Sequence, residues 1–91
     1  MKIIYRMHAV RRMFERNINE EEVLYAIKNG TAIQEYPNDQ PYPSRLLLSI
    51  MNGRPIHTVI AENQKDDEII VITVYEPDAE QWDKNYERKI K

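Results

Sequence analysis

The sequence predicts a single α+β domain over residues 1–91: two short helices packed on an antiparallel meander of three to four strands, then a C-terminal helix. Three observations predict this order. Apolar residues recur every three to four positions in two stretches before residue 30. From Thr31 the apolar period changes to two, which is typical of strands. Asn52-Gly53 is the dipeptide of a tight hairpin turn.

The first helix is predicted over residues 7–16, with Val10, Met13 and Phe14 forming an apolar stripe that faces the core. It is expected to end near Asn17, because asparagine tolerates the left-handed conformation. A second helix is expected to begin at Asn19, whose side chain forms a capping box with Glu22, and to end at Asn29-Gly30.

The strands follow from apolar alternation and from turn residues. If residues 52–53 form the turn, Leu48 faces His57 and Leu46 faces Val59. The strand at residues 69–75 is apolar on both faces, so it is expected at the centre of the sheet. The other expected elements are an edge strand at 1–6, strands at 31–36, 45–51 and 54–62, a proline-rich loop at 37–44 and a helix at 79–91.

Composition narrows the class of protein. With 42% hydrophobic and 31% charged residues, the chain is of the globular and not the disordered type. The absence of cysteine excludes disulfides and thiolate metal sites, and it fits a reducing compartment. The N-terminal apolar run is too short for a signal peptide or a membrane span. We therefore expect a cytoplasmic protein with no membrane partner.

Charge is unevenly distributed along the chain. The net charge is −2, but residues 1–16 sum to +4, residues 84–91 to +3 and the stretch between them to −9. If the two ends meet in space, they form a basic patch suited to an anion. The alternative is two solvated faces that never meet.

His8, Arg12 and Arg16 share one face of the first predicted helix at a spacing of four. An imidazole can take and give protons at neutral pH, and guanidinium groups bind phosphate oxygens and stabilise a charged phosphorane. These residue types therefore suit phosphodiester chemistry. The alternative is a solvated face in which Glu15 pairs with Arg11 or Arg12.

His57 lies mid-strand among apolar residues, where a buried structural role competes with a role beside His8. Tyr75 ends the last predicted strand, and with Trp82 it is a candidate for stacking on bases, although Trp82 fits the core better. No zinc-binding spacing and no glycine-rich phosphate loop is present, so we expect no metal and no cofactor.

Five segments of the chain carry a resemblance to a known family: HAVRRMFERNI, EEVLYAIKNGTAIQEYP, PSRLLL, RPIHTVIA and IIVITVYEPDAEQW. Over about residues 7–88 the chain resembles domain-of-unknown-function family 4258. Asn17 and Ser49 stand where that family commonly has glycine. The positions that carry the resemblance best are His8, Arg12, Arg16, Gly30, Tyr36, Pro37, Ser44, His57, Tyr75, Pro77 and Trp82.

The family is similar, more distantly, to the RelE-, BrnT- and MqsR-like ribonuclease toxins. This resemblance implies a RelE-like fold, metal-independent cleavage of RNA, and two partners, namely RNA and a small antitoxin protein. In this hypothesis His8 or His57 is the general base or acid, Arg12 and Arg16 stabilise the phosphorane, and Tyr75 orients the RNA. Further contacts to RNA are assigned to Arg45, Arg54, Lys84 and Arg88.

A second hypothesis stays open. The acidic net charge suits a non-catalytic interaction module that binds a protein partner through its sheet or through the proline-rich loop.

Overall fold

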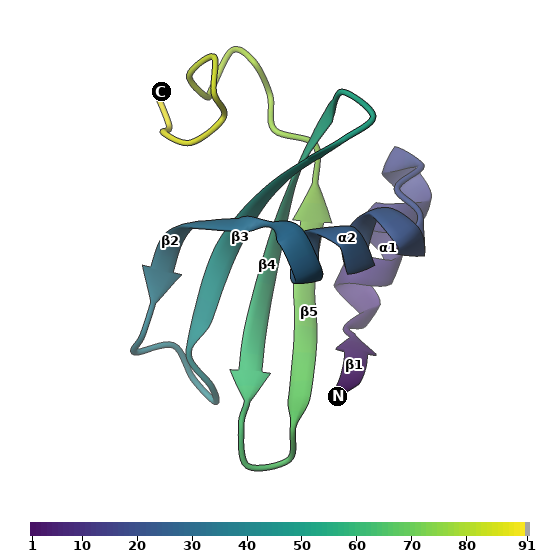
Figure 1. The fold of residues 1–91 in the computed structure, drawn as a ribbon, viewed down its shortest axis with the longest axis vertical. Helices are drawn as coiled ribbons and strands as arrows, with labels where there is room; N and C mark the ends of the chain where they lie inside the picture. Colours follow the sequence, from purple (N-terminus) through teal and green to yellow (C-terminus); the bar gives the residue numbers. More distant parts are fainter. Residues whose placement is uncertain (91) are drawn as a thin grey trace.

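The computed structural model describes residues 1–90, which form two helices and a five-stranded sheet (Figure 1). The sheet order is β1-β5-β4-β3-β2. Strand β1 is parallel to β5, and the other neighbouring pairs are antiparallel. The elements are β1 (Lys2–Tyr5), α1 (Met7–Arg16), α2 (Glu20–Asn29), β2 (Thr31–Tyr36), β3 (Ser44–Met51), β4 (Arg54–Asn63) and β5 (Glu68–Tyr75).

The predicted architecture needs correction, although the α+β class and the two N-terminal helices agree with it. The sheet is mixed and has five strands, because Lys2–Tyr5 pairs in parallel with residues 68–71 of β5. The middle strand is β4, and β5 lies between β4 and β1. The edge strand predicted at 1–6 is present as β1, but parallel pairing joins segments far apart in sequence, so local pattern could not reveal its partner strand.

The predicted C-terminal helix at 79–91 is also wrong. Residues 76–90, called the C-terminal segment below, form turns and one isolated bridge between Trp82 and Lys89; residue 91 lies outside the described residues. Side chains compete with helix formation here: the Asp83 carboxylate accepts hydrogen bonds from the backbone N–H groups of Asn85 and Glu87. Tyr86 has φ 60, outside the right-handed helical region.

Local signals at the helix ends are confirmed. Asn17 ends α1 in the left-handed conformation, with φ 56 and ψ 44. At the start of α2, the Asn19 side chain accepts from the Glu22 N–H at 2.8 Å, and the Glu22 carboxylate accepts from the Asn19 N–H at 3.1 Å. This is the predicted capping box.

The hairpin of β3 and β4 is confirmed with its register. Asn52 and Gly53 both have positive φ, 53 and 80, as a two-residue primed turn requires. Leu48 therefore pairs with His57, and the rest of the ladder follows.

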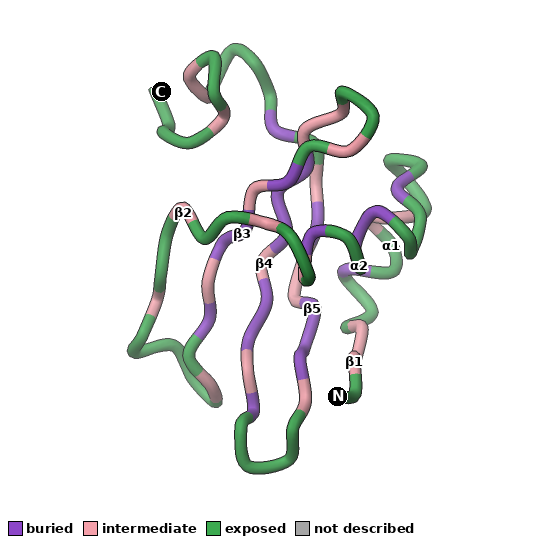
Figure 2. The backbone as a smooth tube through the Cα atoms, viewed as in Figure 1, coloured by how far each residue is buried: buried purple, intermediate pink, exposed green. Residues whose placement is uncertain are grey.

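The core lies between the helices and one face of the sheet, where buried residues gather along the strands (Figure 2). Two residues of α1 face this core: Ala9, which has no exposed surface, and Met13, which is partly buried. The prediction that Val10 and Phe14 face it is wrong, because Phe14 is 90% exposed. Ala9 belongs to the same core cluster as Val71 and Val74 of β5, and this orientation of α1 leaves Val10 and Phe14 facing solvent.

Candidate functional site

A surface groove of about 380 Å³ lies between α1 and the end of β5, and we call it the α1–β5 groove. Three of the residues that line it, His8, Arg12 and Arg16, come from α1, at the helical spacing that places them on one face. Tyr75 comes from the last position of β5. The remaining lining residues are Thr73, Glu76, Asp78, Gln81 and Trp82. Four of the five predicted catalytic side chains therefore border one groove.

The path of the chain after β1 explains this arrangement. Strand β1 pairs with β5 only as far as Tyr5 and Val71, and the Arg6 N–H then donates to the Val71 carbonyl. The chain turns directly into α1, which packs against β5. After Val71, the edge of β5 that pairs with β1 is therefore no longer covered by a strand. The polar face of α1 lies beside it instead.

His57, the fifth predicted residue, does not reach the groove surface, because it is completely buried. Strand alternation places it on the sheet face opposite Ile56, which belongs to the helix-covered core. There the C-terminal segment covers it: the Trp82 ring meets the imidazole edge to face, with ring centroids 4.4 Å apart. His57 therefore lies behind Trp82 and Tyr75, which line the groove.

Hydrogen bonds define the tautomer of His57. Nε2 lies 2.7 Å from the carbonyl oxygen of Tyr86, which can only accept, so Nε2 carries the proton. In the neutral ring Nδ1 is then an acceptor, and the Tyr75 hydroxyl, 3.2 Å away, donates to it. A chain of two hydrogen bonds therefore runs from the Tyr86 carbonyl through His57 to the hydroxyl of Tyr75.

Burial sets the protonation of both members of this pair. Loss of solvent lowers the pKa of His57 below 6.5, although the bond to the Tyr86 carbonyl opposes this shift. Burial also raises the pKa of Tyr75 above 10.0, with a smaller contribution from Tyr36. At neutral pH the imidazole is uncharged and the phenol keeps its proton, so Tyr75 is a hydrogen-bond donor and not a base.

The groove carries charges of both signs. Arg12 lies 3.6 Å from Glu15, one of the ion pairs weighed above for this helix face, and both side chains are about half exposed. A pair of this kind contributes at most about 1 kcal/mol, so an incoming anion can displace the carboxylate. Glu76 and Asp78 also line the groove and limit its positive potential.

The other predicted contacts to RNA lie elsewhere. The Arg54 guanidinium is engaged inside the protein: it donates to the carbonyls of Arg16 at 2.7 Å and Asn17 at 3.0 Å, and to Glu76 at 3.0 Å. Lys84 and Arg88 are exposed on the C-terminal segment and are not among the residues lining the groove. These three basic residues therefore do not extend the groove.

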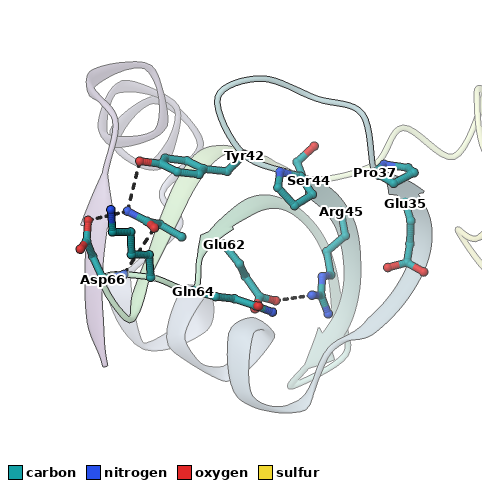
Figure 3. A pocket seen from close by; sticks show the side chains of 11 residues that line it. Glu35, Pro37, Tyr42, Ser44, Arg45, Glu62, Gln64 and Asp66 are labelled. Atoms are coloured by element: carbon teal, nitrogen blue, oxygen red, sulfur yellow. Dashed lines mark hydrogen bonds and ion pairs between the residues drawn. The ribbon is translucent and has the colours of Figure 1, made fainter.

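Arg45 borders a separate pocket of about 650 Å³ near the ends of β3 and β4 (Figure 3). Its guanidinium forms an ion pair with Glu62, and Glu35 and Asp66 line the same pocket. The charges of this pocket are mixed, and none of the five predicted catalytic side chains reaches it. It is therefore a weaker candidate site than the α1–β5 groove.

Two parts of the site are absent from the sequence-based prediction. The Tyr86 carbonyl is a backbone group in an irregular segment, and no side-chain pattern marks it. Asp78 was not among the predicted site residues, and its Oδ1 accepts from the Glu80 N–H within a turn at the groove edge. Within residues 1–90, no group of three or more His, Asp or Glu side chains is placed to hold a metal ion.

The family of the chain follows from its match to a protein-family model. A family model described as a domain of unknown function (DUF4258) matches residues 5–76. The chain belongs to this family. The DUF4258 match runs from the end of β1 through β5 and stops at Glu76, so Pro77 and Trp82 lie outside it. The expected similarity to RelE-like toxins is not confirmed by this match.

The DUF4258 chain matches no curated protein and no solved structure. Within its described residues, no helix is both long and apolar enough to cross a membrane.

Proposed function

We propose that this DUF4258 protein is a metal-independent endoribonuclease that cleaves RNA in the α1–β5 groove, as the cytoplasmic toxin of a toxin–antitoxin pair. One observation carries the proposal: His8, Arg12 and Arg16 line the same groove as a tyrosine hydroxyl that a buried histidine holds in place. An exposed imidazole, two guanidinium groups and a fixed hydroxyl that can orient the RNA are groups that suit phosphodiester cleavage.

In the proposed reaction the 2′-hydroxyl of the RNA attacks the adjacent phosphorus. His8 takes the hydroxyl proton, and Arg12 and Arg16 bind the non-bridging oxygens as charge grows on the phosphorane. The bond to the 5′-oxygen breaks, and this oxygen takes a proton from water, while the hydroxide that forms takes up the proton held by His8. The Tyr75 hydroxyl, whose own proton is bonded to Nδ1 of His57, accepts a hydrogen bond from the RNA and orients it. The products are a 2′,3′-cyclic phosphate and a free 5′-hydroxyl.

His57 acts as a positioning residue in this scheme. Both of its nitrogens are hydrogen-bonded within the protein and it has no exposed surface, so it does not touch RNA. Its role is to hold the hydroxyl of Tyr75, since a group that orients the RNA must itself be fixed in place to be effective.

Cleavage of a single-stranded RNA by the purified full chain in the presence of EDTA tests the proposal. We expect His8→Ala, Arg12→Ala and Tyr75→Phe each to lower the rate by about 100-fold or more. Lys28→Ala, an exposed basic change in the last turn of α2, is the matched control and keeps the wild-type rate. The same RNA with 2′-O-methyl groups stays intact, because it lacks the attacking hydroxyl.

The role of His57 has its own test. His57→Gln is expected to lower kcat with little change in KM, since the residue does not contact the substrate. Expression of the wild-type chain is expected to slow growth, and His8→Ala to relieve that effect. Wild-type protein that neither cleaves RNA nor slows growth would refute the proposal.

An alternative function rests on a different surface. Strand β2 forms one edge of the sheet and is mostly exposed, and residues 37–41 of the proline-rich loop are exposed beside it. A partner protein can add a strand to such an edge. This alternative predicts that Ala32→Pro on β2 weakens binding of the partner, whereas His8→Ala leaves it unchanged.

A further inference from the structure

A second surface hollow, of about 710 Å³, adjoins the α1–β5 groove, and we call it the Tyr86 hollow. The groove and the hollow share a wall, because Arg16, Glu76 and Asp78 line both. From this wall the hollow extends past the end of α1 and the start of β4 to the C-terminal segment. Its other lining residues are Glu15, Asn17, Pro55, Pro77, Ala79 and Tyr86. A ligand bound in the α1–β5 groove can therefore continue into the Tyr86 hollow along the surface.

Arg16 is the charged group of the shared wall that is available to a ligand. Its side chain is exposed, and among residues 1–90 its guanidinium has no carboxylate partner. The carboxylates that line the hollow are already engaged, in ion pairs or in a turn, namely those of Glu15, Glu76 and Asp78. Guanidinium groups bind phosphate oxygens through parallel hydrogen bonds. Arg16 can therefore bind a phosphate where the groove meets the hollow.

Beyond the shared wall the hollow suits a base and not a second phosphate. Pro55, Pro77 and Ala79 supply uncharged, mostly apolar surface, and Tyr86 adds a half-buried aromatic residue. Tyr86 is fixed by its backbone, because its carbonyl accepts the hydrogen bond from Nε2 of His57. It also has φ 60, and residues other than glycine in such conformations gather at functional sites. An aromatic ring and a guanidinium that line one hollow can bind a nucleobase together with its phosphate.

We propose that the Tyr86 hollow binds the nucleotide on the 3′ side of the cleaved bond, which leaves with the 5′-hydroxyl; this inference rests on the proposed function. His8 takes the proton of the attacking 2′-hydroxyl and lines the α1–β5 groove but not the hollow, so the attacking ribose lies in the groove. Arg16 holds the phosphate at the shared wall, and the strand beyond that phosphate enters the hollow.

The leaving base then stacks on the Tyr86 ring. A base within a duplex is already paired and stacked on its neighbours, so it cannot occupy the hollow. The substrate is accordingly single-stranded RNA with at least one nucleotide on each side of the cleaved bond.

Cleavage of two short RNA strands by the full chain tests this assignment. The strands differ only in that the second lacks the base of the leaving nucleotide, a change that keeps the 5′-hydroxyl leaving group. We expect wild-type kcat/KM to be about 10-fold lower for the abasic strand, since stacking of one base on an aromatic ring contributes a factor of this size or more. In Tyr86→Asn the ratio of the two kcat/KM values is expected to approach unity, because the ring is gone. Asparagine is chosen because it tolerates the positive φ of this position.

The ratio distinguishes stacking from a structural effect. A variant that only disturbed His57 would slow cleavage of both strands and keep the wild-type ratio. Tyr25→Asn is the matched control: Tyr25 is 39% exposed on α2 and lines neither the groove nor the hollow, so this variant keeps the wild-type ratio.

Binding of the same strands gives a second measurement that does not depend on the chemistry. With a 2′-O-methyl group at the attacking nucleotide both strands stay intact, and fluorescence anisotropy measures their Kd. We expect loss of the base to raise Kd about 10-fold for the wild type and to leave it nearly unchanged for Tyr86→Asn.

Two results would overturn the leaving-nucleotide site and leave the ribonuclease activity standing: wild-type protein that cleaves and binds both strands equally well, or Tyr86→Asn protein that keeps the wild-type ratios. Wild-type protein that cleaves neither strand would overturn both proposals.

Discussion

Nε2 of His57 donates a hydrogen bond of 2.7 Å to the carbonyl oxygen of Tyr86, and this bond ties the middle strand of the sheet to the C-terminal segment. Tyr86 has φ 60, a conformation that is uncommon for a residue other than glycine. The bond orients the imidazole toward Tyr75, and the imidazole is completely buried. A residue outside the DUF4258 match therefore positions two residues within it.

The first prediction concerns pH. Burial lowers the pKa of His57 in the folded protein, whereas the unfolded chain keeps the ordinary value of 6.5. The unfolded state therefore binds the proton more readily, and the free energy of unfolding falls as the pH drops from about 7.5 through 6.5 toward the folded pKa. Urea titrations between about pH 5.5 and 7.5 measure this slope.

His57→Gln is the matched variant for that measurement, because it removes the titrating group. We expect its free energy of unfolding to vary less over the same pH range. An unchanged slope in His57→Gln would contradict the prediction.

The second prediction uses Trp82, the only tryptophan of the chain. Its ring contacts His57 edge to face, and a contact of this kind adds about 0.5–1.5 kcal/mol beyond the burial of its area. We expect Trp82→Ala to lower the free energy of unfolding by about 1–3 kcal/mol. In the wild type, the fluorescence of Trp82 is expected to change as His57 becomes protonated. If the fluorescence stays constant over the pH range of this protonation, the contact between the two rings is contradicted.

The third prediction concerns Arg54, whose guanidinium joins the end of α1 to Glu76 after β5 and lies 3.4 Å from Glu22 on α2. Removing it leaves carbonyls and the nearly buried Glu22 carboxylate with fewer donors. We expect Arg54→Ala to lower the free energy of unfolding by about 2–3 kcal/mol, and Arg54→Lys to recover only part of this, because lysine lacks the planar fork of donors.

Arg45 supplies the control for that variant. It has a single carboxylate partner, Glu62, and both side chains are partly exposed. We therefore expect Arg45→Ala to cost about 0–1 kcal/mol in the same chemical denaturation experiment. Equal losses for the two arginines would show that Arg54 does not join the elements as described.

The fourth prediction separates the two glycines. A Cβ added at Gly30 would lie 2.4 Å from the Ala26 carbonyl oxygen, which is fixed backbone at the end of α2. A Cβ at Gly53 would meet nothing within 4 Å, but the residue has φ +80. We expect Gly30→Ala to cost the larger share of stability, and Gly53→Ala about 1 kcal/mol from its backbone conformation alone. Thermal unfolding of both variants checks the order, which a larger loss at Gly53 would contradict.

Part of the candidate site followed from spacing alone. His8, Arg12 and Arg16 are four residues apart, and any helix through them places them on one face. That Tyr75 borders the same groove depends on α1 packing against β5, a contact between segments more than fifty residues apart. The burial of His57 depends in turn on the C-terminal segment. This segment consists of turns, so no periodic pattern in the sequence predicts its path.

The sequence by itself determined the features that a few neighbouring residues control: the capping box of Asn19 and Glu22, the left-handed Asn17, and the Asn52-Gly53 turn with the register that follows from it. Only the tertiary structure decided the parallel pairing of β1, the exposure of Phe14 and the engagement of Arg54. The physical reason is range. Caps and turns are governed by bonds within four residues, whereas burial and strand order depend on contacts between distant segments that compete for the same surface.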